Sequence, residues 1–341
     1  MSTVSSPPRL LEAQVLTDAA QLQRLVPEWE ELWRADPRAT PFQSPRWLLP
    51  WWRHIGRGAL LTLAWRDAQG ALAGLAPLYV WPDADGRRQL FPLGIATTDY
   101  LDVLARPGSE EVVARDLFAR LHDLHERWDV LHFPQQRAGS PLLAAAAAHP
   151  RAHVLAGEPN PVLALDAPGR IPRSTLANLR TCRNRAAGIG SLSFATANAQ
   201  EIPACLDALQ RLHAQRWTQR GEPGVLAGTA VRAAHSESAP LLHAAGLLRL
   251  HVLRLAGETV AVLHALADAP QRAARSHYYY ISGFDPGHAF FSPGSLLLAH
   301  AIEQAQGEGA VAFDFLRGAE PYKYRWGAAD RPMFTLRLAS R

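Results

Sequence analysis

Hydrophobic and polar residues alternate along the first half of the chain with the periods of both helices and strands. Apolar side chains within residues 18–35 recur at steps of three and four, which predicts an amphipathic helix. Residues 60–80 form two apolar runs around a glycine-containing turn, the pattern of a β-hairpin. A helix over 109–127 and a short apolar strand over 128–133 are expected to follow.

The second half repeats this order of elements. Residues 247–266 read as another hairpin, followed by a strand over 276–284, a helix over 294–308 and a buried strand over 311–316. We interpret the repetition as an internal duplication.

The duplication predicts an α/β (α+β) fold with two tandem units, residues 1–165 and 166–341. Each unit is expected to have a mostly antiparallel central sheet flanked by helices. Aligning the two hairpin turns places His132 opposite Asp314, each within a short apolar strand.

Composition narrows the class of protein. The 341 residues are 48% hydrophobic and 19% charged, which excludes a disordered chain. Two cysteines cannot form a disulfide framework, and the start of the sequence lacks the apolar segment of a secretory signal, so a cytoplasmic location is expected. Because His122 and His125 have no neighbouring cysteine or carboxylate cluster, no metal site is expected.

The basic residues have an unusual composition. Of 35 Lys and Arg residues, only Lys323 is a lysine. The formal charge of +4 does not by itself indicate nucleic-acid binding. Lys323, however, is a candidate for a position where a guanidinium cannot replace an ammonium.

The strand–helix junction at 292–295 has the composition of an anion site. Ser292, Gly294 and Ser295 surround a proline at the predicted start of the helix. The free amides and positive dipole end of a helix can bind a pyrophosphate or an oxyanion. An ordinary capped helix remains the alternative interpretation.

Several side chains near this junction are candidates for catalysis. Asp314, central in an apolar strand, could orient or deprotonate an acceptor, or form a structural ion pair with Arg317. Lys323 could stabilise an oxyanion, and Tyr322 could return a proton to a thiolate; aromatic packing is the alternative for this tyrosine. His213 is a candidate base.

Two further groups are candidates for binding. Arg216 lies one helical turn after His213, next to Trp217, and both are candidate substrate-binding residues. A second group of arginines could contact phosphates or simply form a solvated helix face: Arg173, Arg180, Arg183 and Arg185.

A family resemblance covers nearly the whole chain. SPGSLLL at 292–298, FDFLRG at 313–318 and EPYKYRW at 320–326 resemble the C-terminal signature of the CelD/BcsL-like acyltransferases of the GNAT superfamily. TPFQSPRWLLPWW at 40–52 and DYLDVL at 99–104 have counterparts in the same family. The resemblance implies a tandem GNAT fold related to the FemABX aminoacyltransferases.

The resemblance also implies a function. It predicts transfer of an acyl group from a thioester, with acyl-CoA as co-substrate, to an amine or hydroxyl of an envelope sugar or small metabolite. Ser292, Gly294, Ser295 and Arg317 would bind this donor. Asp99 and Tyr100 of the first half would line the acceptor site.

Two other functions stay open. GNAT enzymes typically hold the pyrophosphate of coenzyme A with a Gln/Arg-x-x-Gly-x-Gly/Ala loop, whereas SPGS stands here. One alternative is therefore aminoacyl transfer from a charged tRNA, which the arginine group would favour. The other is a non-catalytic binding or scaffold protein among polysaccharide-assembly proteins.

Overall fold

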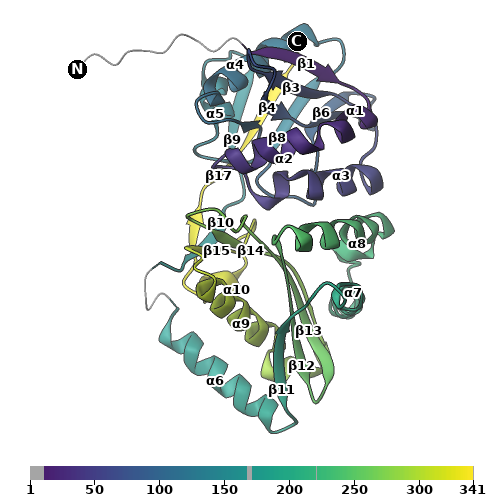
Figure 1. Cartoon of the computed structure of the whole chain (residues 1–341). Coiled ribbons are helices and arrows are strands. Elements are labelled where there is room, and N and C mark those ends of the chain that lie inside the picture. The colour runs from purple at the N-terminus through teal and green to yellow at the C-terminus, as the bar shows by residue number, and fades with distance from the viewer. Residues whose placement is uncertain (1–10, 167–170, 220, 341) are drawn as a thin grey trace, which may run out of the picture. The chain divides into compact units, whose positions relative to one another are not determined.

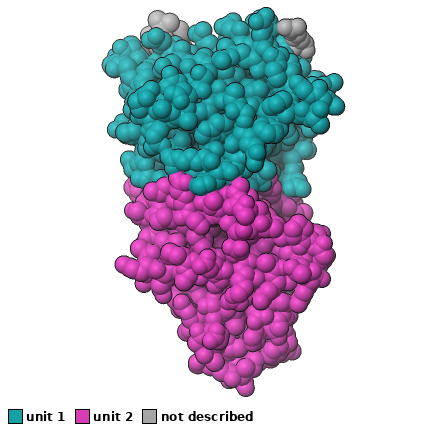
Figure 2. Space-filling model, turned by 90° about the vertical axis from the view of Figure 1, so that its right-hand side faces the viewer, with its two compact units in different colours: residues 1–158, 332–341 teal, residues 159–331 magenta. Residues whose placement is uncertain are grey.

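The chain forms two compact units. The structure, a computed structural model, describes residues 11–166, 171–219 and 221–340. Unit 1 comprises residues 1–158 and 332–341, and unit 2 comprises residues 159–331; Figure 2 colours them separately. Both have sheets flanked by helices, which confirms the expected mixed α/β fold.

Unit 1 contains two sheets. The first has the strand order β1-β3-β4-β7, and the second has the order β2-β5-β6-β8-β17-β9. The strands are β1 (Glu12–Leu16), β2 (Ala59–Leu60), β3 (Thr62–Arg66), β4 (Leu72–Ala76), β5 (Leu78–Pro82), β6 (Arg88–Pro92), β7 (Leu104–Ala105), β8 (Val130–Arg137), β9 (Ala152–Ala156) and β17 (Met333–Ala339).

Helices pack against these sheets and complete the hydrophobic core of unit 1. Leu63 and Trp65 of β3 are buried in one cluster with Val113 and Leu117 of α4. The helical elements are α1 (Ala19–Arg24), α2 (Val26–Ala35), η1 (Pro41–Gln43), α3 (Pro45–His54), α4 (Glu110–Asp123) and α5 (Pro141–Ala147).

The helix predicted over 18–35 is two helices in the structure. Asp18 caps α1, its carboxylate accepting a hydrogen bond from the amide of Ala20 at 3.1 Å. A new helix begins at Val26, with Pro27 in its first turn. Because proline lacks an amide hydrogen, it fits a helix start better than a helix interior.

Unit 2 is built on one seven-stranded sheet with the order β11-β12-β13-β14-β15-β10-β16. All neighbours are antiparallel except β14 and β15. The strands are β10 (Asn160–Ala164), β11 (Leu192–Thr196), β12 (Leu248–Leu255), β13 (Glu258–Ala267), β14 (Ser276–Phe284), β15 (Ala312–Asp314) and β16 (Ala329–Arg331).

Helices cover both faces of the unit 2 sheet. Figure 1 shows α6 and α9 on one face and α7 and α8 on the other. Leu253 of β12 and Leu263 of β13 lie in one buried cluster with Leu297 of α9 and Leu179 of α6. The helical elements are α6 (Arg173–Ala187), α7 (Ile202–Thr218), η2 (Val225–Ala227), α8 (Thr229–Ala244), η3 (Pro286–Phe291), α9 (Pro293–Gly307) and α10 (Pro321–Tyr324).

A parallel strand pair occurs in both units. In unit 1, β6 and β8 are parallel and α4 lies between them in the chain. In unit 2, β14 and β15 are parallel and α9 lies between them. His132 and Asp314, aligned by sequence, therefore belong to strands with equivalent places in their own sheets.

The C-terminal strand joins unit 1 although the sequence analysis assigned it to the second unit. β17 pairs with both β8 and β9 in antiparallel register. Its alternating buried residues, Leu336 and Leu338, belong to the unit 1 core, which explains why the chain returns there. In the described part of the chain, no helix is long and apolar enough to cross a membrane.

Candidate functional site

The candidate site lies where β14 and β15 part. The two strands pair only from Ser276–Tyr278 to Ala312–Asp314. β14 continues to Phe284, and among the described residues no strand pairs with its β15-side edge over 279–284. We call this segment and the space beside it the β14 gap. The backbone amides and carbonyls along this edge of β14 can therefore bind an extended ligand.

A β-bulge occurs at the beginning of the β14 gap. Ala265 of β13 faces Tyr279 while the preceding residue, His264, faces Ile281, so Tyr280 is an extra residue in β14. Tyr279 packs with Phe315, whereas the ring of Tyr280 lies 5.4 Å from that of His264. Consecutive strand residues point to opposite faces of the sheet, so the two tyrosines enter different surroundings.

The start of α9 lies at the far end of the β14 gap. Ser292 adopts a left-handed conformation (φ 52°, ψ 61°) and Pro293 begins the helix. A Cβ atom added to Gly294 would lie 3.2 Å from the Phe284 ring, so glycine permits the close approach of α9 to β14. Ser295, half-buried, donates its amide to the carbonyl of Ser292 at 3.0 Å. The predicted helix start at 292–295 is thereby confirmed.

Two tyrosine side chains form a hydrogen-bonded pair at the β14 gap. The Tyr322 side chain bonds to that of Tyr279, and the Tyr279 hydroxyl also bonds to Ser282. The two tyrosine ring centroids are 6.2 Å apart. Tyr322 follows β15 and Tyr279 lies on β14, so the pair spans the space between the strands. Sequence analysis selected Tyr322 but missed Tyr279, which reads as an ordinary residue of an apolar strand.

Arg216 supplies positive charge at this pair. Its guanidinium carbon lies 4.9 Å from the centroid of Phe284. Nε of Arg216 is buried and has no hydrogen-bond partner within the described residues. Its charge lowers the pKa of Tyr279 and of Tyr322, which places it close to both hydroxyls. The arginine predicted to bind substrate is therefore at the site.

The two tyrosines differ in acidity. Burial raises the pKa of Tyr279, but Ser282, Arg216 and Tyr322 all act to lower it. Burial also raises the pKa of Tyr322, and Tyr279 and Glu320 raise it further. Both hydroxyls are therefore protonated at neutral pH, and the neighbours favour Tyr279 as the member that releases a proton.

Asp314 holds the turn after β15. Its side chain is fully buried, and its Oδ1 accepts a hydrogen bond from the amide of Leu316 at 2.8 Å. Its Oδ2 lies 3.6 Å from a guanidinium nitrogen of Arg331. The geometry thus places this predicted catalytic residue in a structural network, with Arg331 as an ion partner.

Lys323 lies on α10, and its side chain reaches back to the same turn. It is 2% exposed, and its Nζ donates to the carbonyls of Leu316, Arg317 and Gly318 at 3.1, 2.7 and 3.0 Å. Glu320 forms an ion pair with it at 2.9 Å. The ammonium thereby fixes the segment that leads from β15 to Tyr322. Arg317, predicted to bind the donor, contributes its backbone carbonyl to this arrangement.

His213 and Trp217 lie on α7, next to β14. A Cβ atom on Gly283 would come within 2.7 Å of the His213 amide nitrogen, so α7 lies directly on the strand. The rings of His213 and Trp217 are 5.7 Å apart, and Gly224 closely approaches both. Burial, followed by the charge of Arg216, lowers the pKa of His213 to about 4, so this candidate base is neutral at neutral pH.

The first-half candidates belong to unit 1. Asp99 is 4% exposed and Tyr100 is 2% exposed. Tyr100 has a positive φ of 57°, and the guanidinium carbon of Arg137 lies 5.0 Å from its ring centroid. An acceptor-binding role for Asp99 and Tyr100 stays a prediction.

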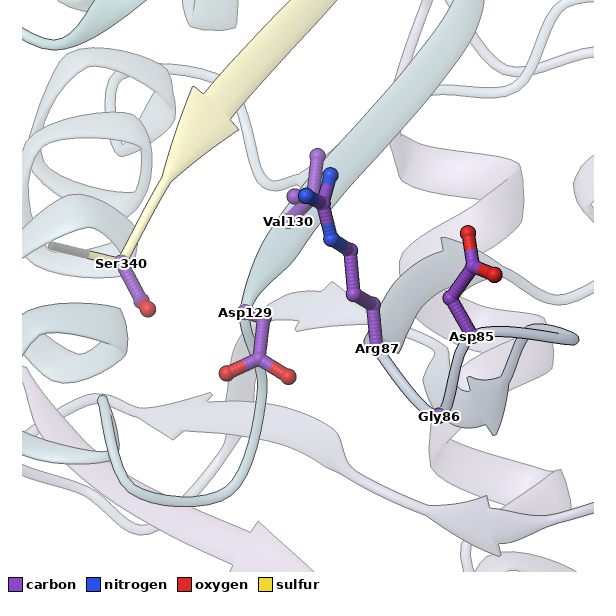
Figure 3. Close-up of a pocket in the computed structure, with 6 residues that line it drawn as sticks. All are labelled: Asp85, Gly86, Arg87, Asp129, Val130 and Ser340. Atoms are coloured by element: carbon purple, nitrogen blue, oxygen red, sulfur yellow. The ribbon is translucent and has the colours of Figure 1, made fainter.

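A separate hollow of about 440 Å³ lies in unit 1, and its lining includes neither Asp99 nor Tyr100 (Figure 3). It is bordered by the turn before β6 and the start of β8. Asp129 on its wall forms an ion pair with Arg88 at 2.7 Å. Its lining includes none of the candidate site residues named above, so we place the candidate chemistry at the β14 gap.

A family model matches the part of the chain that holds the β14 gap. Residues 173–324 match the acetyltransferase (GNAT) domain. This segment lies within unit 2 and includes α9, β15 and α10. The matched segment therefore contains Arg216, Tyr279 and Tyr322. No curated protein sequence matches the chain significantly.

Solved structures resemble the whole chain in fold. FemX is similar at 11% identity with a TM-score of 0.67, over 95% of this chain and 96% of that chain. L-PGS from Bacillus licheniformis is similar at 14% identity and a TM-score of 0.55, over 82% and 84%. A tandem GNAT protein from the clavulanic acid biosynthesis pathway is similar at 16% identity and a TM-score of 0.51, over 97% and 99%. These similarities support the two-unit GNAT-like architecture.

Proposed function

We propose that the GNAT domain transfers an acyl group from acyl-CoA to an amine or hydroxyl of an envelope sugar or small metabolite. The observation that carries this proposal is the β14 gap, which has the Tyr279–Tyr322 pair at one end and the start of α9 at the other. A CelD/BcsL-like role beside polysaccharide-assembly proteins belongs to the same proposal.

Three features of this gap suit the donor. The amide of Gly294 lies in the first turn of α9, where a helix attracts a phosphate. The thioester arm can bind along the unpaired edge of β14, which ends at Phe284. Arg216, with its buried and unpartnered Nε, supplies a cation between the two ends.

The chemistry follows from these positions. The acceptor nitrogen or oxygen attacks the thioester carbonyl, a C–N or C–O bond forms, and the C–S bond breaks. The departing thiolate takes the proton of Tyr279, whose phenolate is stabilised by Ser282, Tyr322 and Arg216. No covalent enzyme intermediate is needed, because donor and acceptor react while both are bound.

A second candidate donor is an aminoacyl-tRNA. Helix α6 contains no acidic residue and exposes four arginines. One of them, Arg183, lies 3.4 Å from Glu303. Such a helix face could contact the phosphates of a nucleic acid. These arginines are Arg173, Arg180, Arg183 and Arg185.

Thermal-shift measurements on the full chain separate the candidates. Coenzyme A, acetyl-CoA and bulk tRNA are added separately, and thiol release from acetyl-CoA is then followed with a panel of amines and amino sugars. We expect acetyl-CoA to raise the melting temperature and thiol release to depend on acceptor. Stabilisation by tRNA alone, with steep salt dependence, would replace the proposal with aminoacyl transfer. A response to neither donor would favour a binding or scaffold protein.

A further inference from the structure

Three polar rings meet on the α8 face of the unit 2 sheet. The ring centroid of His235, on α8, lies 5.6 Å from His264 and 5.5 Å from Tyr280. The His264 and Tyr280 centroids are 5.4 Å apart. Nε2 of His235 lies 3.2 Å from the Tyr280 hydroxyl. These residues come from α8, β13 and β14, so only the folded chain brings them together.

His264 is costly to bury in this way. It is 0% exposed, and neither of its ring nitrogens has a hydrogen-bond partner in the part of the chain that the structure describes. Burial of an unsatisfied polar group costs about 1–3 kcal/mol. The flanking same-face positions of β13 are Val262 and Leu266, and an aliphatic residue between them would avoid this cost.

Tyr280 connects this cluster to the β14 gap. It is the extra residue of the bulge and directly follows Tyr279. It is only half-buried, whereas His264 and His235 are buried. A group bound beside β14 can therefore meet the Tyr280 hydroxyl first, and the imidazole of His235 lies behind it.

We propose that Tyr280 and His235 form a proton relay that deprotonates the acceptor during acyl transfer, with His264 as a positioning residue. This inference rests on the function proposed above. As the new C–N or C–O bond forms, the acceptor gives a proton to the Tyr280 oxygen. The Tyr280 hydroxyl proton moves to Nε2 of His235, which later returns a proton to solvent. The leaving thiolate is protonated separately, by Tyr279, whose phenolate then regains a proton from solvent.

Both imidazoles of the cluster are available as proton acceptors. Burial is the main cause that lowers the pKa of His235 to about 4 and that of His264 to about 3. Both imidazoles are therefore neutral at neutral pH and able to accept a proton. The acceptor nitrogen becomes a much stronger acid as it bonds to the carbonyl carbon, so a weak base can act at that moment.

Assays with two different acceptor substrates test the relay separately from the other steps of acyl transfer. Acetyl-CoA is the donor, glucosamine is an acceptor with a basic amine that depends on a base to lose its protons, and hydroxylamine is a much less basic nucleophile that is largely unprotonated at neutral pH and loses its proton to water more easily once it has bonded to the carbonyl carbon. The variants are Tyr280→Phe, His235→Gln and His264→Asn, with Tyr279→Phe for the leaving-group side. His251→Asn is the matched control, because His251 is equally buried but contacts Thr196 and His300 instead.

We expect Tyr280→Phe and His235→Gln to lower kcat for glucosamine about a hundredfold and to leave hydroxylamine transfer within a few-fold of wild type. The glucosamine rate of these variants should recover as pH rises. His264→Asn should show the same acceptor dependence more weakly, and Tyr279→Phe should slow both reactions. Melting temperatures and acetyl-CoA binding identify any variant that fails to fold.

Each other result counts against the relay. If the relay variants behave like His251→Asn, or slow both acceptors equally, the cluster has only a structural role. A wild-type protein that acetylates hydroxylamine but not glucosamine also overturns the relay, since no base then operates. A wild-type protein that uses neither acceptor and binds no acetyl-CoA overturns the proposed function itself.

Discussion

The ammonium of Lys323 lies 3.1 Å from the carbonyl oxygen of Leu316, a residue in left-handed conformation with a φ of 59°. The next two carbonyls along the chain accept from the same nitrogen. Three carbonyls, together with the Glu320 carboxylate at 2.9 Å, thus surround one compact cation that has three donors. The sole lysine of the chain therefore stands where a planar guanidinium does not fit.

Lys323→Arg is expected to destabilise the protein and lower activity together. The larger planar group cannot donate to all three carbonyls, so one or more stays buried and unsatisfied, at about 1–3 kcal/mol each. Urea denaturation measures the stability, and kcat/KM with acetyl-CoA measures the activity. Arg325→Lys, at an exposed position two residues later, is the control and should change neither. An unchanged Lys323→Arg protein would contradict this account.

Tyr279→Phe should lower kcat more than Tyr322→Phe. Removal of the Tyr279 hydroxyl takes away the group that we expect to protonate the thiolate, at a cost of about a hundredfold or more. Tyr322→Phe removes only its hydrogen bond to Tyr279 and should cost less. Tyr324→Phe is the control. Tyr324 lies on α10 together with Tyr322, but its hydroxyl donates to Asp330 at 2.7 Å. Thiol release at saturating acetyl-CoA gives the three rates; equal rates would remove Tyr279 from the mechanism.

Gly294→Asp should weaken donor binding without weakening α9. A carboxylate in the first turn is favourable to the helix by about 0.3–1 kcal/mol, but it repels an anion bound there. Its Cβ also needs Phe284 to move by a few tenths of an ångström. Gly307→Asp adds the same charge at the other end of α9, where a Cβ meets nothing within 4 Å. Calorimetric titration with coenzyme A should show at least a tenfold loss for the first variant only.

The protein should lose stability as pH falls from about 6.5 toward 4. Five buried histidines have a pKa lowered mainly by burial, so the unfolded chain binds protons in this range while the folded chain does not. Stability is therefore complete above the unfolded pKa of about 6.5 and declines below it, by at most about 1.4 kcal/mol per pH unit for each histidine. The pKa is about 4 for His213, His235 and His277, and about 3 for His251 and His264.

Urea denaturation at pH 7.5 and pH 5 tests this dependence. Asp102 acts in the opposite sense, because burial raises its pKa to about 6 and its stabilising contribution is lost as pH rises through that value. One carboxyl group does not offset five imidazoles. His251→Asn should make the decline shallower, and a protein equally stable at both pH values would show that these imidazoles are protonated in the folded state.

Local patterns predicted the elements around the site but not its geometry. The strand at 276–284, the second-half hairpin and the helix after Ser292 all follow from periodicity and from proline and glycine positions. A sequence has no comparable signal for a β-bulge, so Tyr279 and Tyr280 appeared as ordinary strand residues. The same limit applies to His264, which looks like one polar residue in an apolar strand until its neighbours are known.

The composition singles out Lys323, but it does not predict the surroundings of its ammonium; a role in stabilising an oxyanion stays a prediction. Rarity of lysine indicated that an ammonium matters at this position, and the carbonyls around it explain why. Sequence could not show that a turn would direct three carbonyl groups at one nitrogen. The burial of Asp314 follows from its place in an apolar strand. The hydrogen bond that it accepts from the Leu316 amide depends on the conformation of the turn, which the sequence does not show.

The position of β17 in the unit 1 sheet also determines the order in which parts of the chain can fold during synthesis. Among the described residues, β9 pairs with no strand other than β17, and β17 pairs on its other side with β8. Residues 152–156 must therefore wait for residues 333–339 before they can join their sheet. Unit 2 is a continuous segment and can fold in the meantime. Assembly of unit 1, begun first during synthesis, is then the last step to finish, and a nascent chain that stalls within unit 2 leaves an open edge at β8 for other strands to pair with.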